Sequence, residues 1–137
     1  MRNLLSASAA AAVVLNVSLA FAHHSFAAYD STRTITVKGT ISEFRWINPH
    51  AILVVRADSS QGGATWAIEL SSPGNLTRSG WTRSLVRAGD VVEVIAQPLR
   101  DGSTGAACQK VRLVQTDKSF DCGAAAAIHL GEKPNLQ

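Results

Sequence analysis

The apolar residues between Thr34 and Trp46 alternate along the chain, but the alternation changes phase halfway. Ile35, Val37 and Ile41 occupy odd positions, whereas Phe44 and Trp46 occupy even ones. Alternation with a period of two predicts a half-buried β-strand. A slip of one residue indicates a β-bulge, which bends and twists the strand. Gly39 is a second sign of a bulge or sharp bend. We therefore expect the first strand to curl, as the first strand of a closed barrel must.

Four more strands and one helix are predicted after this segment. The strands are expected at residues 50–57, 65–70, 91–96 and 108–115. Between the third and fourth strands, Ser72 is a good helix N-cap and Pro73 suits the first helical position. Gly80 suits the position just after a helix, where Trp81 and Leu76 would make the hydrophobic contact of a Schellman ending. A short helix is therefore predicted over residues 73–79.

This order of strands and helix is typical of an OB-type barrel. We predict an all-β fold, a small five-stranded OB-like barrel with one short helix between strands 3 and 4; an open five-stranded sheet or a small sandwich are the alternatives. The barrel is assigned to residues 34–116, after an N-terminal arm at 23–33 that Phe26 and Tyr29 are suited to pin down. Residues 117–137 are assigned to a flexible C-terminal tail.

Residues 1–22 have the pattern of an export signal. Arg2 supplies a positive start, residues 4–19 are mostly apolar, and Ala20-Phe21-Ala22 is a cleavage site of the A-x-A type. The expected location is periplasmic or secreted, and no later apolar run is long enough for a membrane span. Since Arg2 leaves with the signal, the thirteen Lys and Arg become twelve, against ten Asp and Glu. This mild excess does not predict nucleic-acid binding.

The two cysteines, Cys108 and Cys122, lie in a chain that is expected to reach an oxidising compartment. A disulfide between them is the expected arrangement there. The alternatives are two separate thiols or a thiol pair that binds a soft metal ion.

Cleavage after Ala22 makes His23 the first residue of the mature chain, followed directly by His24. A free N-terminal histidine offers its α-amine and its imidazole Nδ1 to one metal ion. A third nitrogen is expected from His50 or His24, and three nitrogens with oxygen or water in a tetragonal plane suit Cu(II). Asp30 or Tyr29 is near enough in sequence to add an oxygen. We therefore predict a copper site at His23, His24 and His50, whereas His129 lies in the expected tail.

Each part of this metal site has an alternative interpretation. His23 and His24 are also compatible with a polar, solvated start of the mature chain. His50 is also compatible with a structural residue that makes a hydrogen bond. Cleavage after Phe21 would instead place His24 third, where amine, two amides and imidazole bind Cu(II) in a square. The sequence as a whole contains no recognisable nucleophile motif, phosphate-binding loop or CxxC motif. We therefore do not expect an enzyme. Trp66 is expected in the core, and Trp46 in the core or lining a pocket.

Three stretches of the chain carry a resemblance to a known group of proteins. They are residues 23–30 (HHSFAAYD), 37–50 (VKGTISEFRWINPH) and 80–83 (GWTR). The chain resembles a family of small exported bacterial proteins that is known only as a domain of unknown function, from His23 to about Val114. The resemblance implies a small β-barrel and no established activity. His23, His24 and His50 lie within the matching motifs, whereas the cysteines do not belong to the pattern.

The sequence thus leads to two hypotheses of function. The first is an exported OB-like barrel that binds copper through its mature N-terminus, as a carrier or sensor. The second is a metal-free module that binds a small ligand or a periplasmic protein through the loops around Asn48–His50 and Pro98–Ala106. In OB-type barrels these two loops lie at the ligand-binding mouth.

Overall fold

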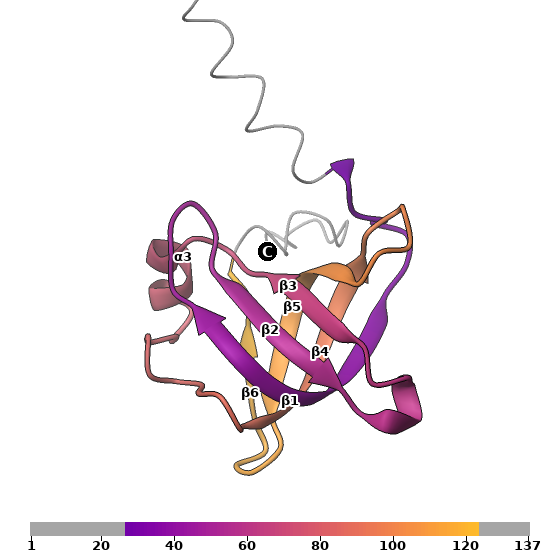
Figure 1. Cartoon of the computed structure of the whole chain (residues 1–137). Helices are drawn as coiled ribbons and strands as arrows, with labels where there is room; N and C mark the ends of the chain where they lie inside the picture. The colour runs from indigo at the N-terminus through magenta and orange to yellow at the C-terminus, as the bar shows by residue number, and fades with distance from the viewer. Residues whose placement is uncertain (1–26, 124–137) are drawn as a thin grey trace, which may run out of the picture.

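The computed structural model describes residues 27–123, which form a closed β-barrel with one short α-helix (Figure 1). The strands are β1 (Ile35–Arg45), β2 (Ile52–Ala57), β3 (Thr65–Glu69), β4 (Val91–Pro98), β5 (Gly105–Leu113) and β6 (Lys118–Asp121). Helix α3 (Pro73–Arg78) lies between β3 and β4, and a 3₁₀ turn, η1 (Ser59–Gln61), lies between β2 and β3. The predicted all-β class and the position of the helix are confirmed.

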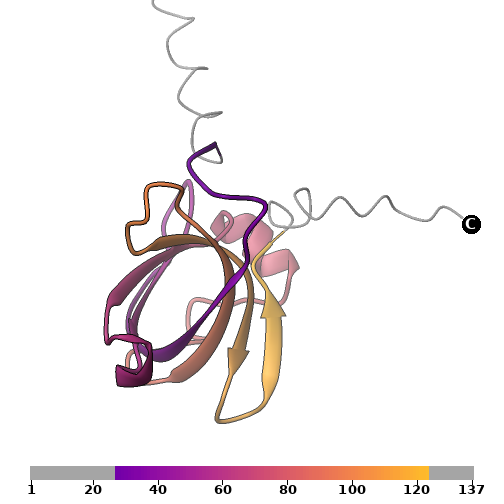
Figure 2. The same cartoon turned by 90° about the vertical axis from the view of Figure 1, so that its right-hand side faces the viewer.

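The barrel closes through one parallel pairing. The strand order is β3-β2-β1-β4-β5-β6, and β3 also pairs with β5. Neighbouring strands run antiparallel except at this junction, where Ala67, Ile68 and Glu69 pair in parallel with Gly105, Ala106 and Ala107. Five strands therefore form the closed ring, and β6 is added to the C-terminal half of β5. Figure 2 shows the barrel from the side, with β6 in yellow.

Strand β1 curls as its sequence predicts. Gly39 pairs with Ala57 of β2 on one side and with Val92 of β4 on the other. A side chain at this position would collide with the backbone carbonyl of Arg56, so only glycine lets the two strands approach. The register against β2 then shifts between Ile41 and Glu43, which is the predicted bulge. The bulge and the glycine together bend β1 enough to belong to both sides of the barrel.

Helix α3 has both of the predicted ends. The Ser72 hydroxyl accepts a hydrogen bond from the Asn75 amide at 3.3 Å, and Pro73 is the first helical residue. At the other end, Gly80 has a φ of 87°, and the Trp81 amide donates to the Leu76 carbonyl at 3.0 Å. Trp81 and Leu76 are both buried. This is the Schellman ending, and it directs Trp81 into the core.

Several element boundaries differ from the sequence prediction. Strand β2 begins at Ile52 rather than at residue 50, so His50 lies in the β1–β2 loop. Strand β4 continues to Pro98 and β5 begins at Gly105, because these ends pair with each other and are buried. The β4–β5 loop is therefore shorter than the expected segment 98–106.

Strand β6 lies within the segment assigned to the tail, so a domain boundary at residue 116 is too early. Its residues pair with Lys110–Leu113 of β5, and the Cys122 carbonyl accepts from the Ser71 amide at 3.1 Å. The first residues of the expected tail, through Gly123, therefore belong to the fold. Residues 1–26 and 124–137, including the expected signal, Phe26 and His129, lie outside the described residues.

The core contains the inward-facing residues of all five barrel strands together with Leu76 and Trp81. Phe44, Trp46 and Trp66 are only partly buried and pack against it, so Trp66 lies at the margin of the core rather than within it. Within residues 27–123, no helix is long and apolar enough to cross a membrane.

Candidate functional site

The N-terminal arm is attached to the mouth of the barrel beside the β4–β5 loop. Tyr29 forms an isolated antiparallel bridge with Leu99. The Asp30 amide donates to the Pro98 carbonyl at 2.8 Å, and the Arg100 amide donates to the Ala28 carbonyl at 2.9 Å. The arm, the β4–β5 loop and the β1–β2 loop all lie at the upper end of the barrel in Figure 1. The prediction that Tyr29 pins the arm is confirmed.

Three side chains from separate parts of the chain meet at this mouth. The Tyr29 hydroxyl donates to Oε2 of Glu69 at 2.6 Å. The other carboxylate oxygen, Oε1, contacts Nδ1 of His50. The His50 side chain is 29% exposed and that of Glu69 is 19% exposed. The result is a chain of contacts from the arm, through the end of β3, to the β1–β2 loop.

The strand register explains why His50 and Glu69 meet. Glu69 pairs with Ile52 across β2 and β3. Side chains two residues apart in an extended chain point to the same face. His50 precedes Ile52 by two residues, so its ring and the Glu69 carboxylate are diagonal neighbours on one face. The Ala51 amide donates to the Ser71 carbonyl at 3.2 Å and continues the pairing past the end of β2.

The surroundings of Tyr29 keep its hydroxyl protonated. Burial, the hydrogen bond to Glu69 and the negative charge of that carboxylate all raise the pKa of Tyr29 well above its ordinary value. A phenol that holds its proton is a hydrogen-bond donor and a poor metal ligand. Tyr29 is therefore suited to orient Glu69 rather than to supply the oxygen that the sequence suggested.

Asp30, the other suggested oxygen ligand, is engaged within the arm. Its Oδ1 accepts from the Thr32 hydroxyl at 2.6 Å and from the Thr32 amide at 3.1 Å. These hydrogen bonds, with a smaller effect of Arg100, lower the pKa of Asp30. Its carboxylate closes the turn that leads from the arm into β1.

Glu69 is the site residue that the sequence did not single out. It alternates with the buried residues Ile68 and Leu70, and such a position is usually an ordinary solvent-facing acid. The available signal was its place at the end of the third predicted strand, opposite the start of the second. Using this signal requires knowledge of the register between β2 and β3. The sequence pattern alone does not give that register.

The metal site predicted from sequence falls only partly within the described residues. His23 and His24 lie outside them, so their positions are not described. Within residues 27–123, no group of three or more His, Cys, Asp or Glu side chains is arranged to hold a metal ion. His50, with its ring oriented by Glu69, is the one predicted metal ligand that the structure places.

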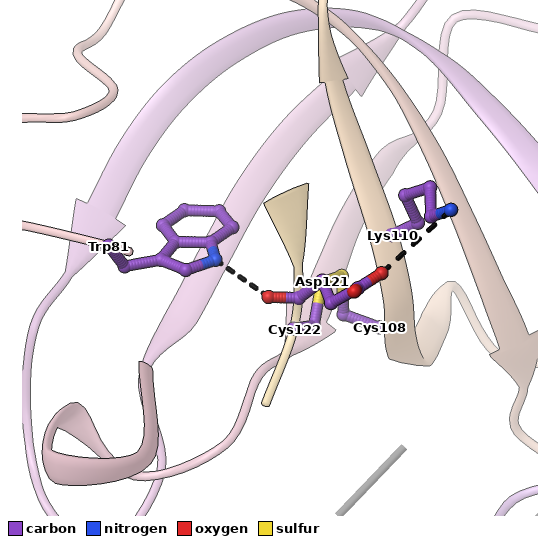
Figure 3. The surroundings of a disulfide bond; sticks show 5 residues. All are labelled: Trp81, Cys108, Lys110, Asp121 and Cys122. Carbon is purple, nitrogen blue, oxygen red and sulfur yellow. Dashed lines mark hydrogen bonds and ion pairs between the residues drawn. A yellow bond between two sulfur atoms is a disulfide. The ribbon is translucent and has the colours of Figure 1, made fainter. Parts of the chain in front are cut away.

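The two cysteines form a disulfide, as expected. The Cα atoms of Cys108 on β5 and Cys122 after β6 are 5.7 Å apart. Figure 3 shows this bridge beside the Trp81 indole, whose N–H donates to the Asp121 carbonyl at 2.8 Å. Both cysteines are buried. The bridge holds β6 against β5 beside Trp81, and neither cysteine belongs to the Tyr29–Glu69–His50 chain of contacts.

Comparison with known proteins gives one match. The model of the family DUF6152, described as a family of unknown function, matches residues 10–108. The matched segment contains the three histidines predicted as metal ligands, and it also contains Tyr29 and Glu69. It ends at Cys108. No curated protein and no solved structure matches the chain.

Proposed function

The chain belongs to DUF6152, a family of unknown function, and from this premise we propose that it is an exported copper carrier or sensor. The metal would be bound between the mature N-terminus and the mouth of the barrel. Its ligands would be the α-amine and imidazole of His23 and the imidazole of His50 or His24. The β-barrel would serve as a rigid support for this site, and no catalytic role is proposed.

The observation that carries the proposal is the contact between His50 and Glu69. Histidines that bind metal ions commonly hold a carboxylate with their other ring nitrogen, which fixes the ring and raises its basicity. In this protein Nδ1 contacts Glu69, so Nε2 is the nitrogen suited to a metal. The Tyr29 hydroxyl in turn fixes the carboxylate. These contacts support the proposal that His50 is a metal ligand.

The position of the arm supports the same conclusion. Tyr29 is attached beside Glu69, and His23 precedes it by six residues. Six extended residues span at most about 20 Å, so a terminal His23 stays within reach of the mouth. A nitrogen-rich donor set completed by oxygen or water favours Cu(II) over harder metal ions. The terminal amine has an ordinary pKa near 8 and loses its proton readily when copper is present.

The test compares two forms of the protein in a calorimetric Cu(II) titration. One begins at a free His23, confirmed by mass spectrometry, and the other begins at the same residue with its α-amine acetylated. The free form should bind copper much more tightly, because only it offers amine and imidazole on one residue. Equal affinities would exclude the terminal chelate. A third form that begins at Ala22 would give the square Ala22-His23-His24 arrangement, and its electron paramagnetic resonance spectrum would differ from that of the chelate at a terminal His23.

A metal-free binding module is the second candidate, and one feature favours it. Ile47, in the β1–β2 loop beside His50, is 51% exposed, and this loop shares the mouth with the β4–β5 loop. Such a surface suits a small ligand or a periplasmic protein. Under this hypothesis the metal-free protein binds its partner equally well before and after copper is added.

A further inference from the structure

A charged groove lies on the outer face of the sheet formed by β1, β4, β5 and β6. Its volume is about 350 Å³, and its lining residues are Thr36, Lys38, Glu93, Ile95, Lys110, Arg112 and Ser119. None of these residues belongs to the mouth of the barrel. The groove is therefore a feature separate from the proposed copper site.

The strand register arranges this groove in two rows. In one row, Lys38 is opposite Glu93, Glu93 is opposite Arg112, and Arg112 is opposite Ser119. In the other, Thr36 is opposite Ile95, Ile95 is opposite Lys110, and Lys110 is opposite Asp121. Neighbouring strands are about 4.8 Å apart. The three cations are thus spread over roughly 10 Å, with Ile95 between them as an apolar floor.

The groove lining has three cations and one carboxylate, and two further carboxylates, Asp117 and Asp121, pair with these cations at the rim. Glu93 is the single carboxylate of the lining; it contacts Lys38 at 2.7 Å and Arg112 at 2.8 Å. Arg112 also contacts Asp117 at the rim, at 2.7 Å. A guanidinium has five N–H donors, and these contacts use three of them.

Lys110 has the loosest pairing of the three cations. Its ammonium is 3.8 Å from Asp121, and both side chains are at least half exposed; Figure 3 shows this pair beside the disulfide. An exposed ion pair of this kind is worth little. A bound anion can therefore replace Asp121 as the partner of Lys110 at small cost.

We propose that this groove binds a small organic acid with two or more carboxylates. A multiply charged acid can contact Lys110 and a second cation at once, while its carbon chain covers Ile95. The hydroxyls of Thr36 and Ser119 offer further hydrogen bonds at either end. The volume suits a metabolite-sized molecule rather than a macromolecule. This inference does not depend on copper binding.

The test is a titration of metal-free, ¹⁵N-labelled protein with citrate, followed by amide chemical shifts. Inorganic phosphate at the same ionic strength is the second probe. Shift changes with citrate should cluster on the four strands of the groove. Glu93→Gln should strengthen citrate binding, because it removes the competing carboxylate, and Lys110→Gln should weaken it roughly threefold.

Two control variants carry the same charge changes outside the groove. Glu43→Gln removes a carboxylate that pairs with Arg45 at the far end of β1, and Lys118→Gln removes an exposed lysine next to Ser119 on the opposite face of β6. Glu43→Gln should change citrate affinity less than Glu93→Gln does, and Lys118→Gln should change it less than Lys110→Gln does. Dispersed shift changes, or equal effects of groove and control variants, would overturn the proposal. Phosphate binding as tight as citrate binding would overturn the assignment to carboxylic acids.

Discussion

The hydroxyl of Tyr29 lies 2.6 Å from the carboxylate of Glu69, forty residues further along the chain. This hydrogen bond joins the N-terminal arm to the strand whose end also holds His50. The arm is thereby attached at the point where the proposed copper ligand is oriented. A change at Tyr29 or Glu69 should therefore affect both the arm and the metal site.

The first prediction concerns the ionisation of Tyr29. Burial and Glu69 raise its pKa in the folded protein, so the unfolded chain releases this proton first as pH rises. The contribution of protonated Tyr29 to the free energy of unfolding is intact below about pH 10, the ordinary tyrosine pKa. It is lost as the pH rises above that value. The chain has one tyrosine, so absorbance at 295 nm follows this group directly. Folded protein should ionise well above pH 10, and denatured protein near pH 10.

The Tyr29→Phe variant provides the control for this pH dependence. Wild-type protein should lose stability above pH 10 more steeply than Tyr29→Phe in denaturant unfolding. Ionisation of the folded wild type near pH 10 would contradict the burial of Tyr29 and its hydrogen bond to Glu69.

The second prediction concerns Glu69 as the residue that orients His50. Glu69→Gln keeps the shape of the side chain but removes its charge. Loss of such a supporting carboxylate typically reduces metal affinity by roughly 10–100-fold, and Cu(II) affinity should fall by this factor. Glu43→Gln, which alters an exposed carboxylate elsewhere on the barrel, should leave copper affinity unchanged. The same small effect from both variants would mean that Glu69 does not support a copper ligand.

The third prediction concerns the disulfide between Cys108 and Cys122. The bridge closes a loop with a sequence separation of 14, which in the chain-entropy model stabilises a protein by about 3 kcal/mol. Replacing both cysteines by serine should lower the free energy of unfolding by this amount, measured by denaturant titration. Copper affinity should not change, because neither cysteine belongs to the Tyr29–Glu69–His50 chain of contacts. Two freely alkylatable thiols in exported, non-reduced protein would refute the bridge.

The fourth prediction concerns Gly39, where β1 changes partners. Gly39→Ala should cost roughly 1–3 kcal/mol or more, because the methyl group would meet the Arg56 backbone and force the strands apart. Gly74→Ala in helix α3 is the matched control, since nothing lies within 4 Å of its added methyl group. The control should be neutral or slightly stabilising. Thermal unfolding of both variants measures the difference, and equal melting temperatures would contradict the close approach.

The features that the sequence predicted correctly are those with a local physical cause. The bulge after Ile41 follows from the phase of neighbouring apolar residues, and the helix ends at Ser72 and Gly80 follow from backbone and capping preferences. Each signal lies within a few residues of the feature that it predicts. The order of these local elements was enough to indicate the barrel.

The features that the sequence missed depend on contacts between distant residues. Strand β6 has four residues and one large apolar side chain, Phe120, which is too little to show a period. It is held by β5, by the disulfide and by the Trp81–Asp121 hydrogen bond. The pairing of Glu69 with His50 likewise depends on strand register. Only the assembled sheet shows that Glu69 is partly buried and differs from the exposed carboxylates.

The last prediction separates the copper hypothesis from the metal-free hypothesis. His50→Ala should preserve the fold, because His50 lies in a loop and is not one of the residues of the hydrophobic core. If His50 is a ligand, Cu(II) affinity should fall at least about tenfold, and the paramagnetic resonance spectrum should lose one coordinated nitrogen. His129→Ala, at a histidine outside the predicted site, is the control and should bind copper normally.

A different pattern of results would assign His50 a structural role. If His50 serves mainly to hold Glu69 and the β1–β2 loop, His50→Ala should lower the melting temperature while copper affinity holds. A spectrum that His24→Ala changes and His50→Ala does not would assign the third nitrogen to His24. The barrel would then take no direct part in metal binding. In that case the exposed Ile47 beside His50 would make ligand or protein binding the better explanation of the β1–β2 loop.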